Sequence, residues 1–170
     1  MVNRVRIREH IPNDLDAYID WQTDPEVARY LSWLPGSRAG AEASLRDSIE
    51  QQSVVDRKRF FFAVILHDTQ EVIGDVGFTV SDRLHGDCGW FLGINFQGRG
   101  YATEAVSEMI AHAFQFQEIE VLTASCRRGN TASTRIMSKC GFVQDDETEK
   151  RLWYRQSRER WGQANAGGTA

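Results

Sequence analysis

Three consecutive strand-like segments that lead directly into one amphipathic helix constrain this sequence more than any other feature. Residues 60–66 (FFFAVIL) form a short apolar run rich in aromatic and branched side chains, and residues 72–80 and 87–94 follow it with the same character. Such runs are too short for most helices and are typical of strands. From residue 101 onward the apolar side chains recur every three or four positions instead, as in a helix with one buried face; they are Ala102, Ala105, Val106, Met109, Ile110 and Ala113. The pattern predicts a three-strand meander followed by a helix that packs on it.

Shorter elements surround this centre. Alternation of Val5 and Ile7 with arginines predicts a first strand that ends before Pro12. Helices are predicted over 13–21, from residue 24, over 39–55 and over 131–140, and further strands at 121–126, 143–144 and 152–156. This order predicts an α+β fold with a mixed sheet of about seven strands and helices on both faces. Because 170 residues is an ordinary size for one domain, we expect a single domain over 1–162 and a flexible tail over 163–170.

Charge and cysteine content exclude several classes of partner. The formal net charge is −4, which disfavours nucleic acid because binding to its phosphate backbone requires a basic surface. No segment approaches the ~20 apolar residues of a membrane span, and residues 1–6 lack the apolar run of a secretory signal, so a cytoplasmic protein without a membrane partner is expected. Cys88, Cys126 and Cys140 are odd in number and far apart, which predicts buried thiols and no metal site.

A glycine-rich turn lies between the third strand of the meander and the amphipathic helix. Residues 97–102 (QGRGYA) place two glycines where the backbone can approach a ligand closely, at the positive end of a helix whose first N–H groups have no partner in the helix. A pyrophosphate suits such a turn. The Walker loop and the dinucleotide fingerprint are both excluded, because the turn lacks Gly-Lys-Ser/Thr and follows a meander rather than opening a parallel βαβ unit.

The same turn resembles a known family. Residues 86–105 (GDCGWFLGINFQGRGYATEA) resemble the acyl-CoA segment of the GNAT superfamily of N-acetyltransferases, with its signature Q/R-x-x-G-x-G/A matched at Gln97, Gly100 and Ala102. Residues 130–142 (NTASTRIMSKCGF) resemble a second family element, N-x-x-S-x-x-x-x-x-x-x-G-F. The YATEA run at 101–105 is similar, more narrowly, to the branch of ribosomal-protein N-terminal (alanine/serine) and antibiotic amine acetyltransferases. The resemblance extends over essentially the whole chain.

The resemblance implies acetyl-CoA as the donor, no metal, and a GNAT fold whose sheet is splayed between strands 4 and 5. It implies that the pyrophosphate lies on N–H groups of the turn and that the pantetheine arm extends along the fourth strand like an added strand. The residues that it assigns to the cofactor are Phe91, Leu92, Gln97, Gly98, Arg99, Gly100, Tyr101, Ala102, Thr103 and Asn130. A helix cap is the alternative interpretation of Asn130.

Two residues are candidates for catalysis. Asp87 stands where this branch commonly has Glu, and its carboxylate is expected to take the proton of an acceptor amine, directly or through water. By the same resemblance, Ser133 is expected near the sulfur and the Leu92 N–H near the thioester carbonyl. Many relatives have a tyrosine acid four residues before the Gly-Phe pair, where this sequence has Met137, so no general acid is assigned.

The acceptor is the least defined part of the expected reaction. The sequence predicts direct transfer of an acetyl group to a primary amine, with Trp33 and Trp90 contacting an acceptor that could be a protein N-terminus, an amino acid, a polyamine or an antibiotic. A CoA-binding regulatory module without turnover is one alternative, and a nucleotide-binding protein that relies on the glycine turn is another. A homodimer is expected only because it is the commonest assembly.

Overall fold

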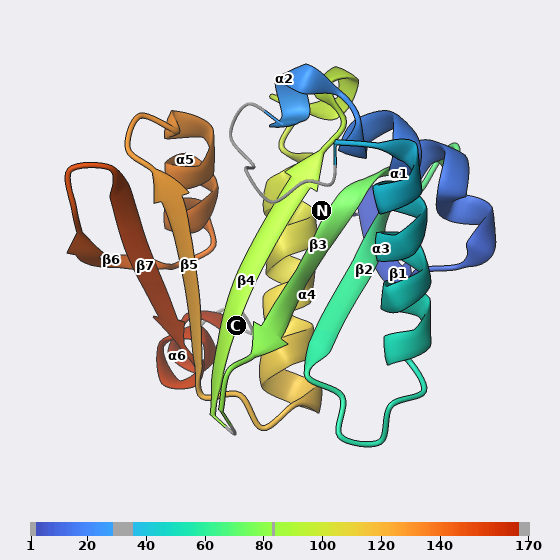
Figure 1. Ribbon diagram of the computed structural model, residues 1–170. Helices are drawn as coiled ribbons and strands as arrows, with labels where there is room; N and C mark the ends of the chain where they lie inside the picture. The colour runs from blue at the N-terminus through green and yellow to red at the C-terminus, as the bar shows by residue number, and fades with distance from the viewer. Residues whose placement is uncertain (1–2, 29–35, 83, 167–170) are drawn as a thin grey trace.

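A seven-stranded sheet runs through the computed structural model, which describes residues 3–28, 36–82 and 84–166 (Figure 1). The strands lie side by side in the order β1-β2-β3-β4-β5-β7-β6. Their bounds are β1 Val5–Glu9, β2 Arg59–Leu66, β3 Val72–Val80, β4 His85–Leu92, β5 Val121–Arg127, β6 Val143–Glu147 and β7 Arg151–Ser157. All neighbours pair antiparallel except β4 and β5, which are parallel, so the predicted mixed sheet and meander are confirmed.

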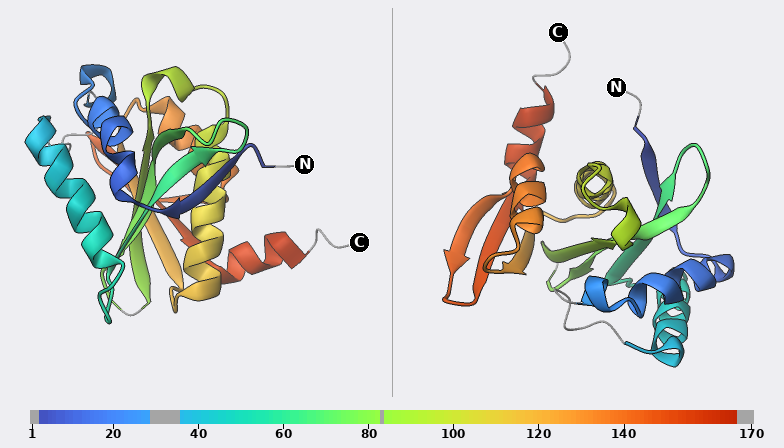
Figure 2. Two further views of the ribbon diagram at one scale, coloured as in Figure 1. Left: turned by 90° about the vertical axis from the view of Figure 1, so that its right-hand side faces the viewer. Right: turned by 90° about the horizontal axis from the view of Figure 1, so that it is seen from above.

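Helices cover both faces of the sheet, as predicted. Figure 2 shows α1 and α3 on one face and α4 on the other. Their bounds are α1 Leu15–Gln22, α2 Pro25–Ala28, α3 Arg38–Gln51, α4 Tyr101–Phe116, α5 Thr131–Lys139 and α6 Arg158–Ala166. Helix α4 is the crossover that a parallel strand pair requires. None of these described helices is long and apolar enough to cross a membrane.

Two apolar clusters pack against opposite faces of β4. The larger lies between the sheet and α4 and includes Phe78, Met109 and Leu92. The smaller lies beneath α1 and α3, where Trp21 packs edge-on against Phe91 with ring centroids 5.1 Å apart. Because Leu92 and Phe91 point to opposite faces, the end of β4 is held from both sides.

Strands β4 and β5 are paired over only three positions. The pairs are His85 with Val121, Gly86 with Leu122 and Asp87 with Thr123. Beyond these pairs β5 remains paired with β7 as far as Arg127, whereas no further β4–β5 pair is present among the described residues. The sheet is therefore splayed between strands 4 and 5, as the family resemblance implied.

The three cysteines are free and buried, which confirms the prediction of buried thiols. Burial raises the pKa of each thiol, with the Cys88 thiol raised well above its usual value. Thiols of this kind are inert packing groups.

The structure differs from the sequence prediction mainly at the ends of elements. Strand β4 ends at Leu92 rather than Ile94, because Ile94–Phe96 form a 3-10 turn, and the helix predicted over 39–55 ends at Gln51. Helix α6 was not predicted, because it buries no residue and so has no apolar stripe to detect. It extends to Ala166, into the segment where a flexible tail is expected; the tail and the domain bounds 1–162 stay predictions.

Replacing Met109 with alanine should lower the free energy of unfolding by about 2–5 kcal/mol, because it leaves a cavity in the core between α4 and the sheet. Met109 is fully buried. Urea denaturation followed by circular dichroism measures the loss. Gln115→Ala, on the exposed side of the same helix, is the matched control and should change stability little. Equal stability of the two variants would contradict the packing described here.

Candidate active site

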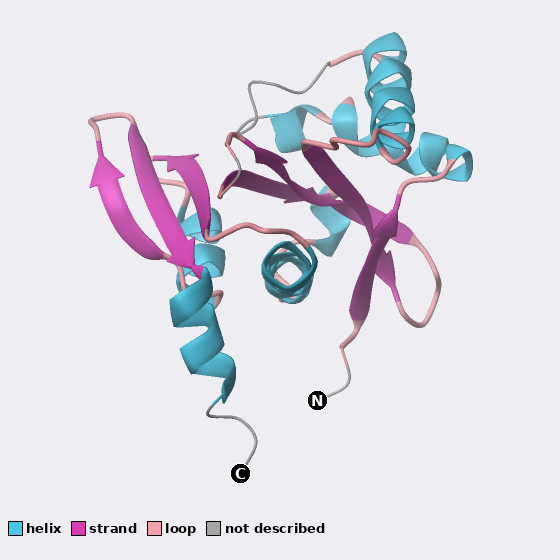
Figure 3. Cartoon of the chain, turned by 90° about the horizontal axis from the view of Figure 1, so that it is seen from below, coloured by secondary structure: helices cyan, strands magenta, loops and turns pink. Residues whose placement is uncertain are grey.

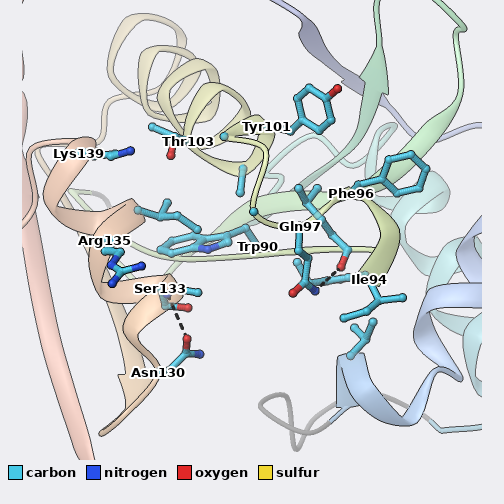
Figure 4. Close-up of a pocket in the computed structure, with 18 of the residues that line it drawn as sticks. Trp90, Ile94, Phe96, Gln97, Tyr101, Thr103, Asn130, Ser133, Arg135 and Lys139 are labelled. Carbon is cyan, nitrogen blue, oxygen red and sulfur yellow. Dashed lines mark hydrogen bonds between the residues drawn. The ribbon is translucent and has the colours of Figure 1, made fainter.

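One cavity of about 380 Å³ opens beside β4, between the start of α4 and helix α5 (Figure 4). Trp90 lies across it, with the loop that contains Gln97 on one side and Ser133 and Arg135 on the other (Figure 4). Of the residues predicted to hold the donor, all line this cavity except Arg99. The predicted residues Trp90 and Ser133 also line it. Residues from two distant motifs thus share one cavity.

The two glycines of the turn adopt conformations that favour glycine. Gly98 has φ 73° and Gly100 has φ 87°, both in the left-handed region, and Gly100 is the N-cap of α4. The Thr103 N–H donates to the Gly100 carbonyl at 3.1 Å. The N–H groups of Tyr101 and Ala102 precede the first bonds of the helix and lie at its positive end. The turn therefore has the chemistry of an anion site.

Arg4 fastens this turn to the first strand. Its Nη2 donates to the Arg99 carbonyl at 3.0 Å, its Nε donates to Glu104 at 2.8 Å, and the guanidinium lies 4.9 Å from the centre of the Tyr101 ring. Burial would raise the pKa of Glu104, but the hydrogen bonds from Arg4 outweigh it and lower that pKa, so the ion pair stays charged. Because a peptide's C=O and N–H point in opposite directions, holding the Arg99 carbonyl also sets the direction of the Gly100 N–H.

Sequence reasoning missed Arg4, and no local signal could have found it. It lies 100 positions before Glu104, and a lone arginine in a strand is ordinarily a solvated residue. Arg4 is a positioning residue for the turn. Arg99, which the family resemblance assigns to the donor site, contributes its backbone carbonyl to this contact.

The exposed edge of β4 faces the gap left by β5. The Gly93 N–H donates to the Ile73 carbonyl at 2.9 Å, which identifies the odd-numbered residues of β4 as those bonded to β3. The N–H groups of Trp90 and Leu92 therefore point to the other side, where β5 has already separated. The Leu92 carbonyl accepts a bond from the Gln97 side chain at 2.9 Å, which braces the turn against the strand.

Helix α5 forms the opposite wall of the cavity. The Asn130 side chain accepts a hydrogen bond from the Ser133 N–H at 3.1 Å, so Asn130 is a helix cap and its side chain also lines the cavity. Arg135 and Lys139 line the same wall and were not predicted, although their spacing of four residues on a helix could have been noticed. These two cations add positive charge to a cavity whose other end is a helix N-terminus.

Asp87 lies outside the cavity, at the last paired position of β4. Its carboxylate accepts a hydrogen bond from the Thr123 hydroxyl at 3.0 Å. Desolvation raises the pKa of this carboxyl, and the Thr123 hydrogen bond and the charge of Arg151 partly offset the increase. A carboxylate with a raised pKa at the point where the strands separate is suited to accept a proton.

Two of the remaining sequence expectations concern positions 33 and 137. Trp33 lies outside the residues that the structure describes. Met137 is fully buried in the core, which is in keeping with the absence of an assigned general acid at that position.

Comparison with known proteins identifies the fold and its relatives. Residues 4–143 match the family model described as an acetyltransferase (GNAT) domain. An uncharacterized N-acetyltransferase, p20, of Bacillus licheniformis is 28% identical over 144 residues, covering 84% of this chain and 80% of that protein.

A GNAT-family acetyltransferase from Bacillus anthracis superposes with a TM-score of 0.82 at 20% identity, covering 94% of this chain and 98% of the other. The ribosomal-protein-S5-alanine acetyltransferase of Vibrio fischeri superposes with a TM-score of 0.78 at 19% identity, and the match covers 95% of this chain and 97% of the other. Structures of an aminoglycoside acetyltransferase and a spermidine N-acetyltransferase, both with coenzyme A, share the fold.

Replacing Arg4 with alanine should raise the dissociation constant for coenzyme A on the order of 10-fold, because the turn loses the contact that orients it. Isothermal titration calorimetry measures the change. Arg6→Ala is the matched control, since Arg6 lies two residues farther along, in β1, but bonds to Gln70. Arg4→Lys should restore only part of the affinity, because one ammonium cannot reproduce the planar guanidinium contact with both partners. Wild-type affinity in Arg4→Ala would remove Arg4 from the site.

Proposed function

The chain belongs to the GNAT acetyltransferase family, and on that premise we propose that it transfers an acetyl group from acetyl-CoA to a primary amine by direct attack on the thioester. The observation that carries this proposal is the shared cavity, in which the open edge of β4, the glycine turn and α5 converge. The proposed donor contacts lie along the open edge of β4 and in the turn that follows it, and the proposed base, Asp87, lies earlier on the same strand.

The donor side of the proposal rests on three kinds of group. The N–H groups of residues 98–102 bind the pyrophosphate, with Arg135 and Lys139 contributing positive charge from the opposite wall. At the open edge of β4, the Trp90 N–H pairs with a pantetheine amide, as a strand would, and the Leu92 N–H faces the thioester carbonyl. These contacts would satisfy backbone groups that the separation of β5 leaves without a strand partner.

On the acceptor side, the proposal must explain how the acceptor amine loses its proton. An amine must lose a proton before it can attack, although a lysine-type amine has a pKa of about 10.4 and an α-amine one of about 8. In the proposed reaction the amine nitrogen forms a bond to the carbonyl carbon, its proton passes to the Asp87 carboxylate, and the C–S bond breaks. The CoA thiolate leaves without an obligatory acid, since a thiol of pKa about 8.5 is a good leaving group. Ser133 supplies a hydroxyl in the cavity near the departing sulfur.

Release of free CoA thiol in the presence of an amine panel tests the proposal. The panel contains peptides with free N-termini, amino acids, spermidine and an aminoglycoside, with buffer alone as the control for hydrolysis. Thiol release that depends on one acceptor class supports an N-acetyltransferase. Binding of CoA without release for any acceptor would favour the alternative, a CoA-binding regulatory module.

Replacing Asp87 with asparagine should lower kcat about 100- to 10,000-fold, because the base is lost while the hydrogen bond from Thr123 can still form. The dissociation constant for CoA should be unchanged. In the wild-type enzyme kcat/KM should fall as pH drops through the pKa of Asp87, since a protonated carboxyl cannot accept the proton; this part of the fall should be absent in the variant, whereas the part caused by protonation of the acceptor amine should remain. Stopped-time thiol assays from pH 5 to 10 measure both. Glu118→Gln, an exposed carboxylate on the loop before β5, is the control; an unaltered pH profile in Asp87→Asn would exclude Asp87 as the base.

A further inference from the structure

The face of the sheet that carries Asp87 continues from β4 across β5 and β7. Asp87 and Phe91 share a face of β4, and Phe91 packs under α1 and α3, so Asp87 lies on the side opposite α4. In Figures 1 and 3, no described helix covers that side of β5 and β7, because α5 and α6 lie on the other. Side chains on this face of the described strands are partly exposed and could contact a ligand.

Two opposite charges are anchored side by side on this face. The Asp87 carboxylate accepts a bond from Thr123 at 3.0 Å, and the Arg151 guanidinium donates to the Ser125 hydroxyl at 2.6 Å. Thr123 and Ser125 are two residues apart on β5, so their side chains share a face and are separated by roughly 6.6 Å along the strand. The Asp87 carboxylate is therefore held at position 123 of β5, and the Arg151 guanidinium is held at position 125, the next residue on that face. Arg151 is close enough to lower the pKa of the Asp87 carboxyl.

This pair of charges lies at the closed end of the gap between β4 and β5. Asp87 and Thr123 are the last paired residues, and Ser125 follows on β5 after the strands have separated. A small molecule on this face can thus present an amine at the gap, beside Asp87, while its other end lies against Arg151. Two further arginines lie on this face: Arg127 is the cross-strand partner of Arg151, and Arg155 is 3.8 Å from Asp145 in an ion pair.

We propose that Arg151 binds the carboxylate of the acceptor, and hence that the acceptor is a free α-amino acid whose amine lies at Asp87. This inference rests on the proposed acetyl transfer and names its substrate class. An α-amino acid carries its amine and carboxylate on one carbon, so it can form a charge-assisted hydrogen bond of about 2.8 Å at each end with two charges that are anchored at neighbouring positions of one strand face.

The same charges disfavour the other acceptor classes. A polyamine or an aminoglycoside would bring a second cation toward Arg151, which costs energy in a partly desolvated site. A peptide N-terminus offers Arg151 a neutral amide carbonyl in place of a carboxylate, and hydrogen bonds between a charged and a neutral group are weaker than those between two charged groups. In the β6–β7 hairpin, Asp145 and Glu147 are paired with Arg155 and Arg128.

Matched acceptors that differ only in the carboxylate test the inference. Phenylalanine is compared with phenylalaninamide, and methionine with methioninamide, in the thiol-release assay with acetyl-CoA. The wild-type enzyme should prefer each free acid over its amide by at least 10-fold in kcat/KM. Arg151→Gln should lower kcat/KM for the acids about 10- to 100-fold, mainly by raising KM, and should leave the amides unchanged.

Arg155→Gln is the control, since it removes an arginine from the same face of the same strand and should leave the preference for acids intact. Ser125→Ala, which releases Arg151 from its anchor, should raise KM for the acids and gives a second test if Arg151→Gln does not fold. Equal losses for acids and amides, a loss confined to Arg155→Gln, or a wild-type preference for amides, peptides or spermidine would overturn the inference while leaving acetyl transfer intact.

An assay in which no acceptor releases thiol distinguishes the proposed acetyl transfer from the proposed carboxylate site. If no acceptor releases thiol, the proposed function fails, and calorimetric titration of phenylalanine into the CoA-loaded protein decides the inference. Binding that Arg151→Gln abolishes and Arg155→Gln retains would uphold the carboxylate site. No binding to the CoA-loaded protein would overturn it.

Discussion

The early separation of β4 and β5 is the constraint on which the rest of the structure depends. Three paired positions are enough to bring the two strands together, and after Asp87 they part. A parallel pair that ends so early leaves N–H groups of β4 without a strand partner, which is unfavourable unless water or a ligand satisfies them. The cavity, the open edge at Trp90 and Leu92, and the position of Asp87 all follow from that one departure from a continuous sheet.

The walls of the gap come from segments that are distant in the chain and are held by specific contacts. Arg4 fastens the glycine turn from the first strand, and Gln97 braces the same turn on the Leu92 carbonyl. Phe91 and Leu92 are packed from opposite faces, so the strand between the two sides of the site cannot shift easily. Rigid walls of this kind reduce the cost of ordering a ligand, since the binding groups are already oriented.

Sequence reasoning was most informative where the relevant residues are neighbours in the chain. The turn around Gly98 and Gly100 is contiguous, and its glycines, its position before a helix and its family resemblance pointed to the same use. It also placed Asn130 and Ser133 correctly at one end of a helix, where they line the cavity. It missed helix α6, which has no buried residue, and it missed the contributions of Arg4 and Arg151, whose partners lie 100 and 26 positions away.

Periodicity and motifs in the sequence alone determined the meander, the amphipathic helix, the glycine turn and the family, because each is written in residues that are close together in the chain. The tertiary structure alone decided which backbone groups β4 leaves open, which arginine orients the turn, and which charges stand beside Asp87. Those features depend on contacts between distant segments: the register of β5 against β7 and the contact of Arg4 with α4 are set by the packing of the whole sheet rather than by any local pattern.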